Sequence, residues 1–483
     1  MELLTRFARL SAAQVLALAL VTRAAAVTPT AAESNAEQRP AAAESVTLAL
    51  AGDLIGPFHP MNRLQDARFA RVAALFRNAD VGFANQEGAI FDLRSFAGHP
   101  AAETGGGRPV QQPARAADIR DMGISLVSKA NNHVTDYGTE GLVETLRNLS
   151  NAGIVAGGAG LSDRAARQPV YLETRNGVVA LVATASTFPP SSVAGAPVVR
   201  DGITSNPRPG MSPLHVRQVR LLPPDLFASI RTAAGPLGTH EGSAIRIGDQ
   251  VFRQDTDIAT RWEMDRSDED AILGAIDEAR GRANLSLFSI HAHETAGDED
   301  PYPPLPFEPM VLHKANEAPS PDDPRPATFE VELFHAAIDR GADVVIRHGP
   351  HVIGGIEVYK GKPIFYSLGS LFLDFGGRRV LNSPGGENLI VPDAWYESVV
   401  AVCQFRGRRL ATIKLYPLTI ESGAGDRSGI PRFATGERAR AILERLQKLS
   451  AAFGTQVEIV DGVGKVRVVE DIRAGAVAKA LIP

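Results

Sequence analysis

Short apolar strands alternate with amphipathic helices along most of this chain, and this alternation limits the folds that it can adopt. Residues 45–55, SVTLALAGDLI, place apolar side chains at alternate positions, and residues 67–80, ARFARVAALFRNAD, place them at helical spacing. The alternation continues through strands at 79–87, 124–133, 177–186, 284–290 and 342–346 and helices at 113–123, 139–153, 268–283 and 328–341. Repeated strand and helix units predict an α/β fold built in layers.

The pattern changes from residue 353 onward, where strands follow one another in pairs. The segments 353–367 and 397–417 each contain a Gly in a central turn, which predicts two antiparallel hairpins. A helix at 435–454 and a possible hairpin at 456–470 follow. We therefore assign residues 45–420 to one domain and residues 421–483 to a C-terminal helix and hairpin packed on that domain.

One long stretch lacks a clear pattern. Residues from about 187 to 260 are rich in Pro and Gly and show little periodicity, so we expect irregular structure there.

The N-terminal segment has the layout of a secretory signal peptide. Arg6 and Arg9 precede an apolar stretch that ends in small residues near Ala26, so we expect residues 1–26 to be removed and the protein to be exported, to the periplasm or the extracellular space of a bacterium. A helical extension or an uncleaved anchor is the alternative. Residues 27–44, rich in Ala, Pro and Glu, predict a flexible linker. No later stretch is apolar enough to predict an integral membrane segment in the mature chain.

Composition excludes several classes of partner and site. The formal net charge is -5, without the basic cluster that nucleic-acid binding requires, so we expect no nucleic-acid partner. Cys403 is the single cysteine, which rules out an internal disulfide and a cysteine-rich zinc site.

Polar side chains collect where the predicted strands end. They are Asp53, Asn85, Glu87, Asn131, Asn132, His133, His291, His293, Glu294, His348 and His351. Ligands of open α/β sheets bind at the carboxyl ends of the strands. Carboxylate, amide and imidazole groups suit borderline divalent ions such as Mn, Fe(II), Zn or Co, and a pair of such ions could clamp a phosphoryl group. A single Asp or His after a strand is usually a helix cap or a structural residue, but five strands converge here.

Several of these segments resemble a known family. LAGDLI, FANQEGAI, KANNHVTDYGTEGL, SIHAHE and GADVVIRHGPHVIGGIEVYKGKPIFYSLGS are similar, in order and spacing, to segments of the bacterial CapA family of poly-gamma-glutamate capsule synthesis proteins. That family belongs to the calcineurin-like metallophosphoesterase superfamily. The resemblance covers about 46–420 and implies a layered metallophosphoesterase-like β-sandwich flanked by helices.

The resemblance also implies roles for individual residues. Asp53, Glu87, Asn132, His291, His348 and His351 would bind two divalent ions, and His133 would be the general acid beside them. Asp136 would orient His133 or cap the next helix. Asn85 would lie near substrate or behind a ligand, and Asn131 would be structural.

Four positions depart from the family pattern. Arg347 replaces a Gly and would face an anionic substrate or form an ion pair at the rim of the site. His293 also replaces a Gly, which adds either a ligand or a hydrogen-bond donor behind one. Ser370 replaces an Asn. Ile55 stands where ordinary metallophosphoesterases have a histidine ligand, so the first metal site would have one ligand fewer.

Three functions remain open on the sequence. The first is an exported metal-dependent hydrolase of phosphoesters that acts in poly-gamma-glutamate capsule synthesis. The second is a non-catalytic protein that binds the anionic polymer during capsule assembly or export, alone or with the capsule synthesis machinery. The third is a metal-dependent hydrolase of gamma-glutamyl bonds. The chain lacks the G-x-S-x-G of serine hydrolases and the Lys-Ser/Thr of a phosphate-binding loop.

Overall fold

A computed structural model describes most of the chain from Ser45 onward. The described residues are 45–56, 64–101, 109–248, 250–296, 325–378, 380–382, 388–425 and 427–468. The expected signal peptide (1–26) and linker (27–44) lie outside them. In the described part of the chain, no helix has both the length and the apolar character needed to cross a membrane.

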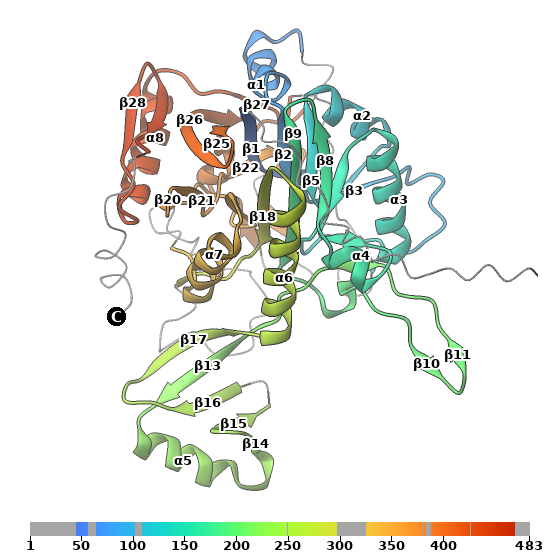
Figure 1. Ribbon diagram of the computed structural model, residues 1–483, viewed down its shortest axis with the longest axis vertical. Coiled ribbons are helices and arrows are strands. Elements are labelled where there is room, and N and C mark those ends of the chain that lie inside the picture. The colour runs from blue at the N-terminus through green and yellow to red at the C-terminus, as the bar shows by residue number, and fades with distance from the viewer. Residues whose placement is uncertain are drawn as a thin grey trace, which may run out of the picture. The chain divides into compact units, whose positions relative to one another are not determined.

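Ten strands form the larger of two central sheets (Figure 1). In order they are β28 (Val457–Val460), β29 (Val463–Val466), β26 (Arg409–Ile420), β25 (Glu397–Arg406), β1 (Val46–Ile55), β2 (Val81–Gln86), β5 (Ile124–Ser128) and β6 (Val155–Gly157), with β22 (Ser370–Leu373) beside β1 and β27 (Pro431–Phe433) beside β26. Strands β1, β2, β5 and β6 run parallel, whereas β25 and β26 are antiparallel.

Six strands form the second central sheet. Their order is β20 (Ile356–Tyr359), β21 (Lys362–Phe365), β19 (Val344–His348), β18 (Leu285–His291), β9 (Gly177–Ala185) and β8 (Val170–Thr174). The four inner strands are parallel, and β20 and β8 are antiparallel edges.

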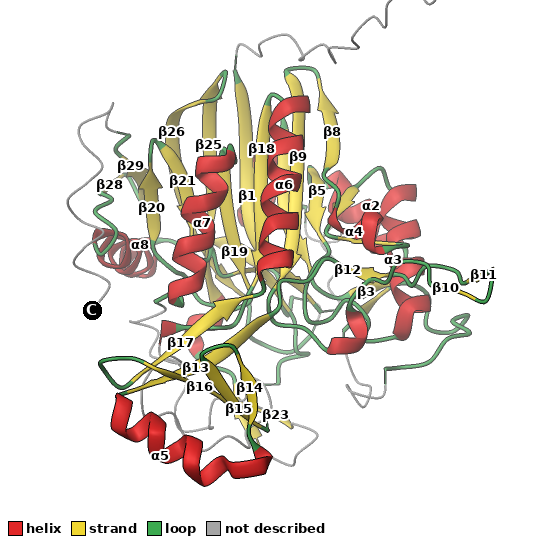
Figure 2. Ribbon diagram, turned by 60° about the horizontal axis from the view of Figure 1, so that its bottom comes forward, coloured by secondary structure: helices red, strands yellow, loops and turns green. Residues whose placement is uncertain are grey.

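The two sheets pack face to face and helices cover their outer faces. One core cluster combines Leu48 and Phe83 of the larger sheet with Leu181, Leu287 and Ile346 of the smaller. Helices α1 (Ala67–Arg77), α2 (Ala114–Asp121) and α3 (Gly138–Asn151) cover the outside of the larger sheet, and α6 (Arg266–Arg282) and α7 (Thr328–Arg340) cover the smaller, as Figure 2 shows for the latter pair. These four layers confirm the predicted α/β fold, a layered sandwich flanked by helices.

The C-terminal elements contribute to the same core. Helix α8 (Gly436–Ala451) buries Ile442, Leu443 and Leu446 in the cluster between the sheets, and β29 pairs with β26.

The stretch expected to be irregular contains a third sheet. Its strands are β14 (Thr239–Glu241), β15 (Ala244–Ile247), β16 (Gln250–Gln254), β13 (Val216–Leu222) and β17 (Ala259–Met264), and α5 (Pro224–Ala234) packs on one face. The expectation was wrong because charged residues are mixed with the apolar ones on the other face. Arg217 and Arg246 both pair with Glu241, at 2.7 and 2.5 Å, on the face that also buries Val219 and Val251, so the ion pairs interrupt the apolar period there.

Smaller elements complete the fold. They are the short strand pairs β3 (Ala89–Ile90) with β4 (Val110–Gln111), β7 (Ala159–Gly160) with β12 (Gly210–Met211), β10 (Val199–Arg200) with β11 (Ile203–Thr204) and β23 (Val380–Asn382) with β24 (Asn388–Ile390), and helix α4 (Asp163–Arg167).

Tight hairpin turns lie at one edge of the sandwich. The turns between Thr174 and Gly177, Tyr359 and Lys362, and Arg406 and Arg409 join β8 to β9, β20 to β21 and β25 to β26. They lie at the amino ends of the parallel strands, because Phe405 pairs with Val46, at the beginning of β1. At the carboxyl ends the connections are longer, as between β18 and α7.

Candidate metal centre

Strand alternation delivers the candidate site residues to the space between the sheets. In β18, Leu285 and Leu287 belong to the inter-sheet core, and His291 lies on the same side two pleats further on. His348 follows Val344 and Ile346 of β19 in the same way, and it lies opposite His291 in the parallel register. The side chains that continue the core at the carboxyl ends of the strands are therefore polar.

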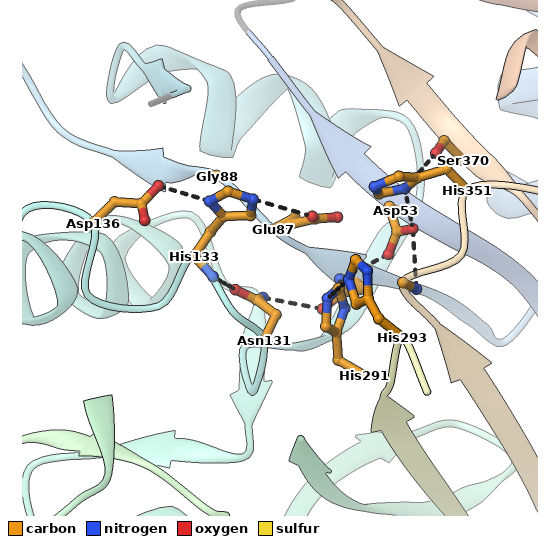
Figure 3. A network of polar contacts seen from close by, with 12 residues as sticks. Asp53, Glu87, Gly88, Asn131, His133, Asp136, His291, His293, His351 and Ser370 are labelled. Atoms are coloured by element: carbon orange, nitrogen blue, oxygen red, sulfur yellow. Dashed lines mark hydrogen bonds and ion pairs between the residues drawn. The ribbon is translucent and has the colours of Figure 1, made fainter. Parts of the chain in front are cut away.

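Three residues form the closest group of potential ligands. One ligand atom each from Asp53, Glu87 and His351 lies within 4.8 Å of the other two, and all three residues are buried. Asp53 Oδ2 lies 3.1 Å from His351 Nδ1 (Figure 3). Asp53 comes from β1 in one sheet and His351 from the loop after β19 in the other, so the group bridges the sandwich.

The loop that carries His351 is tightly constrained. Gly349 has a φ of +114°, and a Cβ there would lie 2.8 Å from the carbonyl oxygen of Ala292, so another residue would strain this turn. His351 itself has a φ of +58°, a left-handed conformation that costs a non-glycine residue free energy. The backbone N–H of Gly349 faces Asp53 Oδ2 at 3.4 Å.

Burial and neighbouring charges shift the ionisation of the two carboxylates in opposite directions. Burial raises the pKa of Asp53, but the hydrogen bond from His351 and the charges of the surrounding imidazoles outweigh it and hold this pKa well below its usual range. Burial raises the pKa of Glu87 well above its usual value, and the charge of Asp53 raises it further. Of these two carboxylates, Glu87 therefore has less compensation of its negative charge by its neighbours.

The buried histidines favour the neutral form that binds metal. Burial lowers the pKa of His291 well below the ordinary value, and the neighbouring His293 lowers it further. Burial lowers the pKa of His348 to about 4 and, together with His351, that of His293 to about 3.

Several buried polar atoms near the carboxylates are suited to bind a metal ion. Within the described residues, Asn132 Oδ1, Glu87 Oε2 and His348 Nδ1 are buried without a hydrogen-bond partner. His348 uses its other nitrogen, Nε2, in a 2.7 Å contact with the hydroxyl of Ser289, and its ring packs against Phe83. An amide oxygen, a carboxylate oxygen and an imidazole nitrogen are all metal ligands, so this set fits a divalent ion.

His133 stands beside the carboxylates in a fixed orientation. Its Nδ1 lies 2.8 Å from Asp136 Oδ2, and its Nε2 lies 3.6 Å from Glu87 Oε1. The side chain of Asp136 thus holds the ring of His133, whereas the residue at the N-cap of α3 is Tyr137. Of the side chains in this group, His133 keeps some exposure, with 17% of its side chain accessible.

A chain of side-chain amides runs behind the ligands (Figure 3). The backbone N–H of His133 donates to Asn131 Oδ1 at 3.1 Å, and Asn131 Nδ2 donates to Asn85 Oδ1 at 3.2 Å. Asn85 Nδ2 donates to Asp53 Oδ1 at 2.8 Å and lies 3.3 Å from His291 Nδ1. Asn85 thus supports two candidate ligands, and Asn131 has the structural role expected of it.

Arg347 does not face the metal centre. Its side chain is fully buried, its Nε lies 2.6 Å from Glu330 Oε1 on α7, and its Nη2 donates to the carbonyl oxygen of Glu294. Neighbouring residues of a strand point to opposite faces, and His348 occupies the inner one. The substrate-facing role considered for Arg347 is therefore wrong. Arg347 forms an ion pair, which was the alternative, but the pair lies between β19 and helix α7 and not at the rim of the site.

Two residues near the centre escaped the sequence analysis. Lys129 is buried and its Nζ donates to the carbonyl oxygen of Glu87 at 2.9 Å, while burial lowers its pKa to about 8. Trp395 packs edge-on against His351, with ring centroids 4.7 Å apart. The only sequence signal for Lys129 was its position directly before the ANNH segment. Trp395 gave no signal, because it is far from the other site residues along the chain.

The fold and the candidate site together define the class of this protein. It is an α/β sandwich with a cluster of carboxylate and imidazole groups at the carboxyl ends of its strands. The sequence profile of the family described as "Bacterial capsule synthesis protein PGA_cap" matches residues 47–319 and 311–374. The chain belongs to this family.

Relatives at the sequence level include capsule proteins. The protein y4sH of Sinorhizobium fredii is 33% identical over 436 residues, which cover 83% of this chain and 88% of that one. The capsule biosynthesis protein CapA of Bacillus anthracis is 23% identical, over 79% of this chain and 69% of that one. The PGA biosynthesis protein CapA of Bacillus subtilis is 24% identical, over 55% of this chain and 47% of that one.

Solved structures show a weaker likeness. A phosphatase from Mycoplasma pneumoniae has 10% identity and a TM-score of 0.37, covering 78% of this chain and 94% of that one. A putative 5'-nucleotidase from Staphylococcus aureus has 11% identity and a TM-score of 0.35, covering 83% and 58%.

Proposed function

We propose that this protein is an exported metal-dependent hydrolase of the phosphoester class that acts in the synthesis of an anionic capsule polymer. Asp53, Glu87, Asn132, His291, His348 and His351 would hold the divalent ions. When bound, the ions would supply positive charge that polarises the phosphoryl group. The capsule context comes from the family, whose CapA members in Bacillus are named for capsule or PGA biosynthesis.

The orientation of His133 is the observation that carries the hydrolase proposal. A protein that only binds a polymer needs charge at its site, but it has no need for an imidazole held by a carboxylate. Here Asp136 fixes Nδ1, and Nε2 points toward Glu87 at 3.6 Å. Such a ring can deliver a proton to a leaving oxygen beside the metal ligands, a step worth roughly 10² to 10⁴ in rate.

Replacement of His133 tests this role. In His133→Gln, we expect zinc or manganese content and thermal stability close to wild type, and turnover of a poor alkyl leaving group to fall by roughly 10² to 10⁴. A nitrophenyl ester, which leaves without much proton help, should lose less activity. Rates with both esters and elemental analysis give the answer, with exposed His240 replaced by Gln as the matched control.

A metal-loaded wild-type protein that hydrolyses no phosphoester would contradict the proposal. Turnover of poly-gamma-glutamate in the same assay would assign a gamma-glutamyl hydrolase, and binding of that polymer without turnover would assign a polymer-binding protein.

Export rests on the N-terminal segment, where Arg6 and Arg9 precede the apolar stretch. We expect protein secreted by the native host to begin near residue 27, as N-terminal sequencing would show. Intact Met1 found only in the cytoplasmic fraction would contradict export.

A further inference from the structure

The two faces of the third sheet differ in how their arginines are paired. Neighbouring residues of β13 alternate between the faces, so Arg217 lies on one face and Arg220 on the other. Arg217 pairs with Glu241 at 2.7 Å and lies 3.6 Å from Glu263. Among the described residues, Arg220 has no such partner, and its Nε is buried without a hydrogen bond. The described part of the chain therefore leaves the charge of the Arg220 guanidinium unpaired.

Two more polar groups without a partner lie on the face of Arg220. Thr260 lies directly opposite Arg220 where β17 pairs with β13 (Figure 1), and directly opposite residues point to the same face of a sheet. Thr260 is 2% exposed, and its hydroxyl is buried without a hydrogen-bond partner in the structure. Trp262 follows two residues later on the same face, and its indole Nε1 is buried in the same way. We call Arg220, Thr260 and Trp262 the donor patch.

Apolar side chains flank the donor patch along the sheet. Phe252 lies beside Arg220 in the parallel register of β16 and packs against the cluster under α5. On the other side, Val216 and Met264 pack against the cluster under α7, and the ring of Trp262 lies 6.4 Å from that of Phe329. Burial of unpaired polar groups among apolar neighbours costs free energy, and a bound acceptor would recover it.

We propose that the donor patch is a binding site for an oxyanion, a carboxylate or a phosphate group. A guanidinium and an indole N–H can only donate hydrogen bonds, so Arg220 and Trp262 cannot satisfy each other. The hydroxyl of Thr260 can accept from one of them, which leaves the other for a ligand. The ligand must therefore supply acceptor atoms, and the charge of Arg220 favours an anion over a neutral acceptor.

The donor patch is chemically distinct from the metal centre. It contains no carboxylate and no imidazole, so it can hold an anion but offers no group for acid–base chemistry. Arg220 and Trp262 remain partly exposed, which gives a small anion access to them. The site therefore adds a second place for an anionic group to the one proposed at the metal ions.

Inorganic phosphate and glutarate, a small dicarboxylate, are suitable probes. In metal-free protein at constant ionic strength, we expect at least one of them to raise the melting temperature of the wild type in a saturable way. Stabilisation by phosphate alone would assign a phosphate site, and stabilisation by glutarate would assign a carboxylate site. If neither anion stabilises the protein beyond the effect of sodium chloride, the proposal is wrong.

Three variants separate binding from folding. Arg220→Met keeps an apolar stem and removes the guanidinium. Because Arg220 makes no ion pair in the fold, we expect this variant to match or exceed the wild-type free energy of unfolding without the anion and to lose the stabilisation by the anion. Thr260→Val keeps the shape of the side chain and should weaken anion binding by about 10-fold. Arg217→Met, on the opposite face, is the control and should keep the wild-type anion affinity.

Two results with these variants would overturn the proposal. An Arg220→Met protein that is less stable than wild type without the anion, or that does not fold, would show that the guanidinium supports the fold. Unchanged anion affinity in Arg220→Met or in Thr260→Val would show that the anion binds elsewhere. None of these measurements uses turnover or added metal, so the anion site and the hydrolase proposal can fail independently.

Discussion

Glu87 places a buried carboxylate beside that of Asp53, and its Oε2 has no hydrogen-bond partner among the described residues. Burial and the charge of Asp53 both raise its pKa. A carboxyl whose pKa is raised on folding stabilises the folded state below the unfolded pKa, and that contribution is lost as pH rises through the folded pKa. The metal-free protein therefore loses stability from this site as Glu87 ionises.

The effect of replacing Glu87 by Gln on the free energy of unfolding should change sign when metal is bound. Without metal, we expect Glu87→Gln to match or exceed the wild-type free energy of unfolding, with the difference growing as pH rises from below 4.5, the ordinary Glu value. With zinc the order should invert, because the amide cannot supply the lost charge. Urea unfolding between pH 4 and 8, with and without chelator, measures both. A difference independent of pH would show that the Glu87 carboxyl does not titrate as described.

Single residues of the site were predictable where strand alternation and position agreed. Asp53, Asn85 and His291 follow strands whose apolar side chains show which face is inward, and the structure places them together. The same alternation predicts that Arg347 points outward, because its neighbour His348 occupies the inward face. Trp395 could not be predicted, because only tertiary folding brings it to His351.

A buried ion pair joins helix α7 to strand β19. Arg347 pairs with Glu330, and Glu330 also accepts from the backbone N–H of Ala327 at 2.8 Å at the beginning of the helix. Removal of one partner of such a pair leaves an uncompensated buried charge.

We expect Arg347→Met to lower the free energy of unfolding by roughly 3–5 kcal/mol. The matched control is Arg340→Met, whose exposed pair with Asp277 should contribute roughly 1 kcal/mol or less. Urea unfolding of both variants measures the difference. A variant at 347 with normal stability but weakened binding of anionic substrates would restore the substrate-facing role.

Elements were predictable where one period dominated the sequence. Helices α1, α3, α6, α7 and α8 and the core strands stand where periodicity predicted them. The sheet of β13 to β17 was missed because cross-strand ion pairs interrupt the apolar alternation of its strands. Strand β22 was missed because it is short and pairs with β1 far away in the chain. Local patterns report local structure, whereas pairing between distant strands depends on the whole core.

The candidate metal ligands are divided between the two sheets. Asp53 lies on β1 and Glu87 directly after β2 of the larger sheet, and His291 and His348 lie on β18 and β19 of the smaller. Since both sheets share one core, an ion held between them should stabilise the sandwich as a unit.

At a zinc concentration 100 times the dissociation constant, we expect the wild type to gain about 2.7 kcal/mol in free energy of unfolding. Asp53→Asn should lose most of this gain, and His240→Ala should keep it. Calorimetry with fluorescence as a second probe measures the gain. Stabilisation confined to part of the unfolding transition would mean that the ion does not join the sheets.

The two edges of the sandwich have different roles, because tight turns connect the strands at one edge and the candidate metal centre lies at the other. The turns at Thr174, Tyr359 and Arg406 lie at the ends of the strands opposite the candidate ligands, so we expect changes there to affect folding more than the site. At the opposite edge, longer connections follow the candidate ligands along the chain, as between β18 and α7. Descendants of one ancestral sandwich can therefore exchange those connections, and with them the molecule that is recognised, while they inherit the same scaffold and the same chemistry.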